Sequence, residues 1–138
     1  MPPDYQALAE VRHQIRRFLA FSERAALDAG LEPAQHQLLL AIVGLPRGTR
    51  PTIGALAERL LLKHHSAVEL AGRLVRRRLV RRARSDQDGR EVLLEVTAQG
   101  HRLLARLSVV HSSELRTRGP DLVKALQPLI GRKTRRGV

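Results

Sequence analysis

The sequence predicts a mainly α-helical protein with one small β-hairpin, and three observations support this fold class. Apolar residues recur at helical spacing before residue 76 and again after residue 97. Between these parts, two short β-prone runs flank the turn-rich stretch ARSDQDGRE at 83–91. The length of 138 residues suffices for one domain with a modest core.

The first predicted helix spans residues 4–30, with Asp4 as its N-cap and Gly30 as the residue that ends it. Apolar and small residues recur along it at alternating spacings of three and four, which is typical of a coiled-coil seam. The seam consists of Leu8, Val11, Ile15, Phe18, Ser22 and Ala25. So broad an apolar surface predicts that this helix packs against more than its own small domain.

Three further helices are predicted over residues 33–44, 52–61 and 64–78. The first of them is almost wholly apolar at 38–43, which predicts a central place in the core. Thr52 is the expected N-cap of the second. A narrow inward stripe of small and medium side chains marks the third, formed by Ala67, Leu70, Ala71 and Leu74.

The hairpin and the C-terminal helices follow. A strand starts at Leu79-Val80, and EVLLEV at 91–96 is the returning strand. Thr97 is the expected N-cap of a fifth helix that extends to about Arg118. Gly119-Pro120 is expected to break this helix before a short final one.

The composition of the chain indicates which class of molecule it binds. The chain has 25 Lys and Arg against 13 Asp and Glu, a net charge of +12, which predicts a polyanion, nucleic acid first and an anionic membrane second. The only aromatic residues are Tyr5, Phe18 and Phe21, far from the arginine-rich part. Because single strands are bound by stacking bases on aromatic side chains, duplex DNA is favoured.

Several classes are disfavoured by what the sequence lacks. No apolar run is long enough for a membrane span, and the N-terminal segment does not have the pattern of a secretory signal. Without cysteine there is no disulfide and no thiolate-ligated metal. A cytoplasmic protein with no cofactor is expected. No nucleophile elbow, phosphate loop or metalloprotease motif is present, so an enzyme is not expected.

Two short helices joined by a tight turn and followed by a hairpin predict a winged helix-turn-helix. In that fold the second helix enters the major groove, and the loop of the hairpin follows the backbone or enters the minor groove. The sequence also resembles the MarR (multiple antibiotic resistance regulator) family of transcription factors. The resemblance rests on LAERLLLKHHSAVELAGRL at 56–74, LVRRARSDQDGREVLLEVT at 79–97 and TAQGHRLLARL at 97–107.

Two positions depart from the family pattern, which often has glycine in the turn of the helix-turn-helix and again just before the wing. These positions are Leu61 and Arg78 here. Leu61 predicts a turn that does not need a positive φ. Arg78 adds charge where the family often bends freely.

The resemblance implies one MarR-like domain over residues 1–138, with dimerisation helices at 1–30 and 98–131 and a winged helix-turn-helix at 33–97. It also implies a homodimer whose interface is built from both ends of the chain, although an ordinary intrachain core is the alternative for the same apolar residues. The expected interface residues are Leu8, Val11, Ile15, Phe18, Leu19, Leu107, Val110, Leu115, Leu122, Leu126, Leu129 and Ile130.

The expected DNA-binding face begins on the fourth helix, where the side chains can reach base edges and phosphates. The alternative is that a histidine only caps this helix and that Glu69 is simply solvated. Residues 63–90 carry nine basic and three acidic residues, half of the net charge of the chain, which favours a polyphosphate footprint over a solvated charged face. The expected DNA-binding residues here are His64, His65, Ser66, Glu69, Arg73, Arg76, Arg77, Arg82 and Arg84.

Asp88 and Arg90 complete the site at the wing. An acid two residues before an arginine can orient the guanidinium through a charge-assisted hydrogen bond. The resemblance implies that Arg90 is the wing-tip arginine that enters the minor groove and that Asp88 braces it. The alternative is a plain hairpin turn at Asp88-Gly89 with an exposed Arg90.

The remaining histidines are scattered and lack the ligand spacing of a zinc motif, so satisfied or surface histidines are favoured over a metal site or a pH switch. These are His13, His36, His101 and His111.

The expected function is a homodimeric, sequence-specific regulator of transcription, a repressor of a pseudo-palindromic duplex operator. The resemblance implies release by a small, often aromatic and anionic, effector. The alternative is a nonspecific architectural protein associated with DNA or RNA.

Overall fold

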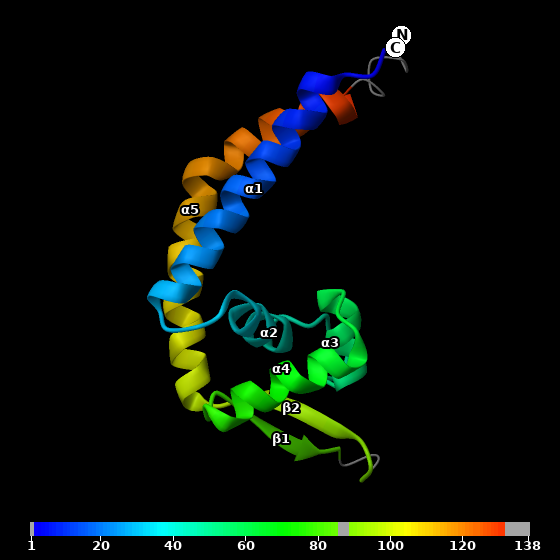
Figure 1. Cartoon of the computed structure of the whole chain (residues 1–138), viewed down its shortest axis with the longest axis vertical. Helices are drawn as coiled ribbons and strands as arrows, with labels where there is room; N and C mark the ends of the chain where they lie inside the picture. The colour runs from blue at the N-terminus through cyan, green and yellow to red at the C-terminus, as the bar shows by residue number, and fades with distance from the viewer. Residues whose placement is uncertain (1, 86–88, 132–138) are drawn as a thin grey trace. The chain divides into compact units, whose positions relative to one another are not determined.

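The computed structural model describes residues 2–85 and 89–131 and is mainly helical with one antiparallel hairpin, as predicted (Figure 1). The chain divides into two compact units, one formed by Met1–Ala25 with Ser108–Val138 and the other by Ala26–Leu107. The described elements are α1 (Tyr5–Asp28), α2 (Pro33–Val43), α3 (Ile53–Leu60), α4 (His64–Arg76), β1 (Val80–Arg84), β2 (Val92–Val96) and α5 (Ala98–Ile130).

Both ends of α1 have the predicted signals. The Asp4 carboxylate accepts a hydrogen bond from the backbone N–H of Ala7 at 3.0 Å, so Asp4 is the N-cap. Gly30 has φ +81°, a left-handed conformation that glycine adopts without strain. The N–H of Leu31 then returns to the carbonyl of Ala26 at 2.9 Å, which closes the end of the helix.

The core of the Ala26–Leu107 unit is built from α2, α3, α4 and the hairpin. α2 begins with a capping box, in which Glu32 and Gln35 exchange side-chain and backbone hydrogen bonds. The central place predicted for α2 is confirmed on one face only, since Leu40 and Val43 on its other face are about half exposed. The largest fully buried side chains are Leu31, Leu38, Leu39, Leu56, Leu74, Leu79, Val80 and Leu94.

The turn between α3 and α4 differs from the prediction. Leu61 has φ 56°, in the left-handed region, where we had expected no positive φ. The N–H of Leu61 donates to the carbonyl of Glu58, and the N–H of Leu62 donates to the carbonyl of Ala57 at 2.8 Å. These two bonds close the end of α3, and the left-handed backbone of Leu61 follows from this closure. Arg78, the second departure from the family pattern, has φ 61°. Both positions therefore keep the glycine-like backbone without glycine.

The hairpin is held in register by cross-strand pairs, of which Val80–Val96 is buried, and by a third segment. Val80 pairs with Val96 and Arg82 with Leu94. Beside β2, the N–H of Leu94 bonds the carbonyl of Pro51 at 2.9 Å, and Thr52 forms a bridge with Leu93. The loop that leads into α3 thus extends the edge of the hairpin and fixes it to the helix-turn-helix.

The segment TAQG, from Thr97 to Gly100, joins the hairpin to α5. The hydroxyl of Thr97 accepts from the N–H of Gly100 at 3.1 Å and donates to the carbonyl of Arg78 at 2.8 Å, so Thr97 is the predicted N-cap. A Cβ on Gly100 would overlap the Leu79 carbonyl oxygen and lie 2.7 Å from Val96 Cγ1. Glycine is needed here because α5 approaches the backbone closely.

α5 is a single helix from Ala98 to Ile130, and the predicted break at Gly119-Pro120 is wrong. A proline removes one N–H and displaces the carbonyl four residues before it. Pro120 is exposed, so the carbonyl of Arg116 can turn to water while the neighbouring turns keep their bonds. Within the unit that contains both chain ends, α1 and this part of α5 run side by side in opposite directions (Figure 1).

Candidate nucleic-acid interface

The two faces of α4 have opposite character. The predicted inward stripe is confirmed, because Ala67, Leu70, Ala71 and Leu74 are 2% exposed or less. These side chains hold the helix against the core of its unit. The exposed side chains on the remaining surface of α4 are His64, His65, Val68, Glu69, Arg73 and Arg76, and Ser66 is half-buried.

The first turn of α4 is open. Its N-cap is Lys63, which makes no side-chain capping hydrogen bond, and neither His64 nor His65 takes that role. The first amides of a helix lack partners within the helix and carry the positive end of its dipole. The start of α4 can therefore accept a phosphate, and Ser66 stands in its first turn to add a hydroxyl donor.

Two of the predicted DNA-binding arginines are bound to α2. Arg77 Nη1 donates to Gln35 Oε1 at 2.9 Å, and Gln35 is itself part of the capping box of α2. One turn earlier, Arg73 Nη1 lies 3.5 Å from the Glu32 carboxylate, a pair whose side chains are about half exposed. These contacts hold the C-terminal half of α4 on the start of α2. Both arginines are exposed and both have a partner at the start of α2, and the bond of Arg77 to Gln35 is the shorter of the two contacts.

The wing is braced at its base by Arg50, which comes from the loop before α3. Arg50 Nη1 lies 2.7 Å from Glu91 Oε1, and Nη2 donates to Glu91 Oε2 at 3.0 Å. A further bond joins Arg50 to the hydroxyl of Ser85 at 3.2 Å. The hydrogen bond from Nη2 to Oε2 is charge-assisted, so this pair fixes geometry as well as charge. The two ends of the wing loop are thereby held together by one side chain.

The other charged residues of the hairpin and its loop differ in the group that each one contacts. Arg84 Nη1 donates to the carbonyl of Gly89 at 2.7 Å, across the wing loop. Arg81, which the sequence analysis left out of the DNA-binding set, forms an ion pair with Glu95 at 2.9 Å. Arg90 is exposed. Asp88 lies outside the described residues, so the expected brace between Asp88 and Arg90 stays a prediction.

Sequence reasoning missed two features of this unit. Arg50 is distant in sequence from the wing, and no local pattern marks it as a brace. Val68 could have been found, because it follows His64 by four residues and so lies on the same helical face. Val68 is 43% exposed, an apolar side chain among the polar ones of α4. An exposed methyl surface on such a helix suits the C5-methyl group of thymine.

The other unit carries an unusually apolar surface. Of the residues expected at a dimer interface, six are more than two fifths exposed: Leu8, Ile15, Leu19, Val110, Leu115 and Ile130. Val11, Phe18, Leu122, Leu126 and Leu129 are half-buried. Leu107 differs, because it is 3% exposed within the single chain and belongs to the Ala26–Leu107 unit. It has almost no surface left for a partner, and its expected role is better explained by intrachain packing.

His111 lies at the centre of a small aromatic cluster in the same unit. Its Nε2 is 2.8 Å from the Ser22 hydroxyl, and its ring meets the edges or faces of Phe18 and Phe21 with centroids 6.1 and 5.5 Å away. His36 is buried in the other unit. Among the described residues, no three potential metal ligands come together. Over the same residues, no helix is long and apolar enough to cross a membrane.

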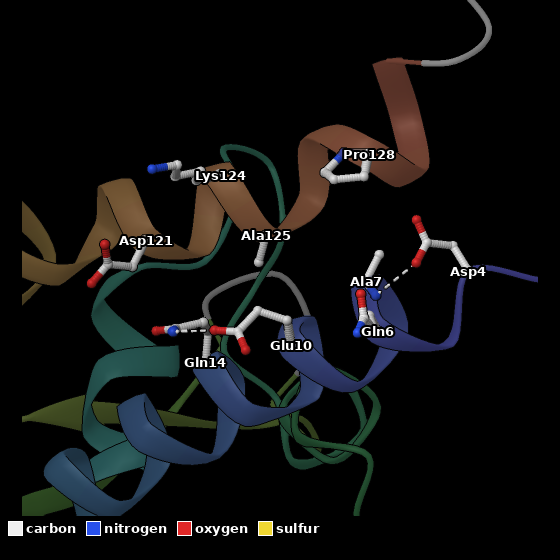
Figure 2. A pocket seen from close by; sticks show the side chains of 9 residues that line it. All are labelled: Asp4, Gln6, Ala7, Glu10, Gln14, Asp121, Lys124, Ala125 and Pro128. Carbon is white, nitrogen blue, oxygen red and sulfur yellow. Dashed lines mark hydrogen bonds between the residues drawn. The ribbon is translucent and has the colours of Figure 1, made fainter.

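A cleft of about 450 Å³ lies between α1 and the C-terminal part of α5 (Figure 2). Its wall presents the carboxylates of Asp4, Glu10 and Asp121 against the single ammonium of Lys124. Gln14 donates to Glu10 at 2.8 Å on the same wall. The other lining residues are Gln6, Ala7, Ala125 and Pro128. With an acidic wall and no aromatic ring, this cleft does not suit the aromatic, anionic effector that the resemblance implies.

Comparison with known proteins agrees with this geometry. The family model described as MarR family matches residues 29–91. The crystal structure of a MarR family transcription regulator has a TM-score of 0.76 and 20% identity, covering 95% of this chain and 87% of that chain. A search of curated proteins finds no match.

Two further solved structures were obtained with bound molecules. A mutant of MepR from S. aureus, bound to an oligodeoxyribonucleotide, has a TM-score of 0.66 and 17% identity over 99% of this chain and 94% of that chain. The PcaV transcriptional regulator from Streptomyces coelicolor, in complex with its natural ligand, has a TM-score of 0.61 and 26% identity over 91% of this chain and 92% of that chain.

Proposed function

We propose that the protein is a DNA-binding transcription regulator of the MarR family and that it acts as a homodimeric repressor, because residues 29–91 match the model of that family and the chain is similar in fold to its solved members. Its target would be a pseudo-palindromic duplex operator. Each protomer would place α4 in the major groove and its wing on the adjacent backbone or minor groove.

The exposed surface of α4 carries this proposal. Its inward stripe is buried, and its outward side chains offer donors, acceptors and one apolar contact. Such a mixture can distinguish base edges, whereas a purely cationic surface would read only phosphate. For this reason we favour a sequence-specific regulator over a nonspecific architectural protein. The DNA-binding set is His64, His65, Ser66, Glu69, Arg73, Arg76, Arg82, Arg84 and Arg90, with Asp88 as the brace of Arg90.

The apolar surface of α1 and α5 supports the homodimer. Side chains such as Leu8, Ile15 and Leu115 are between 43 and 47% exposed. Large exposed apolar surfaces are typical of interaction sites. A second copy with the same surface gives a closed two-fold interface, and two-fold symmetry in the protein matches a pseudo-palindrome in the DNA.

The proposal includes release of the DNA by a small effector. Its support is that PcaV was solved with its natural ligand. An effector can release DNA only if it binds one state of the dimer more tightly than the other. A screen would measure thermal stabilisation of the free protein by small aromatic acids, and then the change in operator affinity caused by each compound that binds.

The central test is selection from a pool of random duplexes at near-physiological salt, followed by sequencing of the retained DNA. A pseudo-palindrome with half-sites about one helical turn apart is the expected result. Retention without enrichment would instead support the architectural protein, because nonspecific binding rests on phosphate contacts alone.

The selected operator then allows a test of the wing. Arg90→Ala should weaken operator binding and lower the dependence of affinity on salt. Arg102→Ala removes an exposed arginine from α5 and is the matched control. Equal affinity and salt dependence for Arg90→Ala and the wild type would mean that the wing assignment is wrong.

A further inference from the structure

The structure separates the arginines of α4 and the hairpin into those with a partner and those without one. Arg73, Arg77, Arg81 and Arg84 each bond an acceptor within the chain. Within residues 2–85 and 89–131, Arg76, Arg82 and also Arg78, in the turn between α4 and β1, form no ion pair or hydrogen bond through their side chains. Cations left without a counter-charge are the groups most able to accept an external anion, and of these three Arg76 and Arg82 approach the same place.

These two guanidinium groups converge over Gly72, at the middle of α4. A Cβ built on Gly72 would lie 3.5 Å from Arg76 Nη1 and 3.8 Å from Arg82 Nη2, with no other described atom within 4 Å apart from its two chain neighbours and the helix backbone. The two nitrogens are therefore no farther apart than the sum of these distances. Gly72 is buried, although its helical neighbours Glu69 and Arg76 are exposed.

The convergence follows from where the two side chains start. Arg76 is one turn after Gly72 on α4, so its side chain leans back over that glycine. Arg82 lies opposite Leu94 in the hairpin and shares a sheet face with the buried Val80. The aliphatic part of the Arg82 side chain can lie along the edge of the core, so that its guanidinium group reaches α4. Glycine at position 72 leaves the space between the two groups open, although a methyl group there would make only ordinary contacts with them.

We propose that Arg76, Arg82 and the bare Gly72 backbone form a clamp for one phosphate of the DNA backbone, at the junction of α4 and the wing. The proposal rests on the function proposed above. A phosphate presents several oxygens from one phosphorus atom, and hydrogen bonds of about 2.8 Å from two sides match two converging guanidinium groups. The clamp would fix the register of the protein on the duplex without reading the base sequence.

A substitution at Gly72 tests the clamp without removing either arginine. Gly72→Glu places a carboxylate between the two guanidinium groups, which should satisfy them within the chain and lower operator affinity by at least about tenfold. Gly72→Gln has the same size and no charge, so its loss should be clearly smaller. Both residues are better helix formers than glycine, so neither change should unfold α4.

The arginines are then removed singly and together, with the operator and a scrambled duplex as probes. If both hold the same phosphate, Arg76→Ala with Arg82→Ala should reduce the slope of log affinity against log salt by about 0.9, the value for one phosphate. The loss should be equal on both duplexes, because phosphate contacts carry no sequence information. Arg81→Ala is the control, since Arg81 is the next strand residue and is paired with Glu95.

The outcomes are distinguishable. Operator binding that is unaffected by Gly72→Glu and by the double variant would overturn the clamp and leave the proposed function standing. A slope change of about twice 0.9 would overturn the shared phosphate, because each arginine would then hold its own. If the wild-type protein binds no duplex at all, both the proposed function and the clamp are wrong.

Discussion

The two compact units of the chain differ in what their apolar residues do. In Ala26–Leu107, leucines such as Leu39, Leu56 and Leu74 are completely buried within one protomer. Among the described residues of the unit that contains both chain ends, the buried ones are the small or polar Ala7, Gln14 and Ala125, and the large apolar side chains are half-buried or exposed. The first unit has a core of its own, whereas the second has the composition of half an interface.

The largest expected effect tests the self-contained core. Leu74→Ala removes a fully buried side chain from α4 and should lower the free energy of unfolding by about 3 kcal/mol. The measurement is urea unfolding followed by circular dichroism at several protein concentrations. Leu115→Ala, in the other unit and 45% exposed, is the control and should cost far less in the single chain. Equal losses would remove the distinction between the units.

Ile15→Glu tests the other side of the comparison. Ile15 is 43% exposed in the single chain, so a glutamate is tolerated there when the protein is monomeric. In a dimer the charge would be buried, and we expect the dimer dissociation constant to rise at least about a hundredfold. Sedimentation velocity over a concentration series measures it. Arg16→Gln, at the exposed neighbour of Ile15, changes the net charge by the same amount and is the control. An unchanged dimer would place the interface elsewhere.

Gly100→Ala tests the junction at which α5 begins. The added Cβ would meet the Leu79 carbonyl and the Val96 side chain, so we expect a loss of about 2 kcal/mol from strain. Gly54→Ala in α3 is the matched control, because nothing lies within 4 Å of that Cβ and the change should be neutral or stabilising. Thermal unfolding of both variants provides the comparison. A neutral Gly100→Ala would mean that the junction is looser than its geometry indicates.

The smallest effect concerns the turn between α3 and α4. Leu61→Gly relieves a left-handed conformation that costs a side-chain-bearing residue roughly 1 kcal/mol, but it also adds entropy to the unfolded chain. The leucine side chain is 91% exposed, so little packing is lost. We expect a net gain of about 0.5 kcal/mol, measurable by urea unfolding. A clear loss of stability would show that the side chain has a contact in the assembled protein.

Most of the fold could be predicted because its signals are local. Asp4, Thr52 and Thr97 were recognised as caps from their own sequence neighbourhoods, and the inward stripe of α4 follows from helical periodicity. The errors arose where a local rule competes with its surroundings. Pro120 does not end α5, because the loss of one hydrogen bond is small beside the remaining turns. Leu61 adopts a backbone conformation usually taken by glycine.

The candidate site was predicted as a region rather than as individual roles. The arginine run identifies the charged surface, but residue type cannot reveal which guanidinium groups have partners. Arg77 is bonded to Gln35, distant in sequence, and Arg50 reaches the wing from the loop before α3. The convergence of Arg76 and Arg82 depends on the packing of a helix on a hairpin. Such contacts are long-range, and one sequence carries no signal for them.

The bond between Gln35 and Arg77 has a consequence for how operator preference can change during evolution. Gln35 is buried at the start of α2, yet its side chain holds the far end of α4. If α4 enters the major groove as proposed, replacing Gln35 would let α4 settle at a new angle while every residue of the proposed DNA-binding set stayed the same. Genetic selections for new target sequences should therefore recover changes at Gln35 as well as on the exposed face of α4.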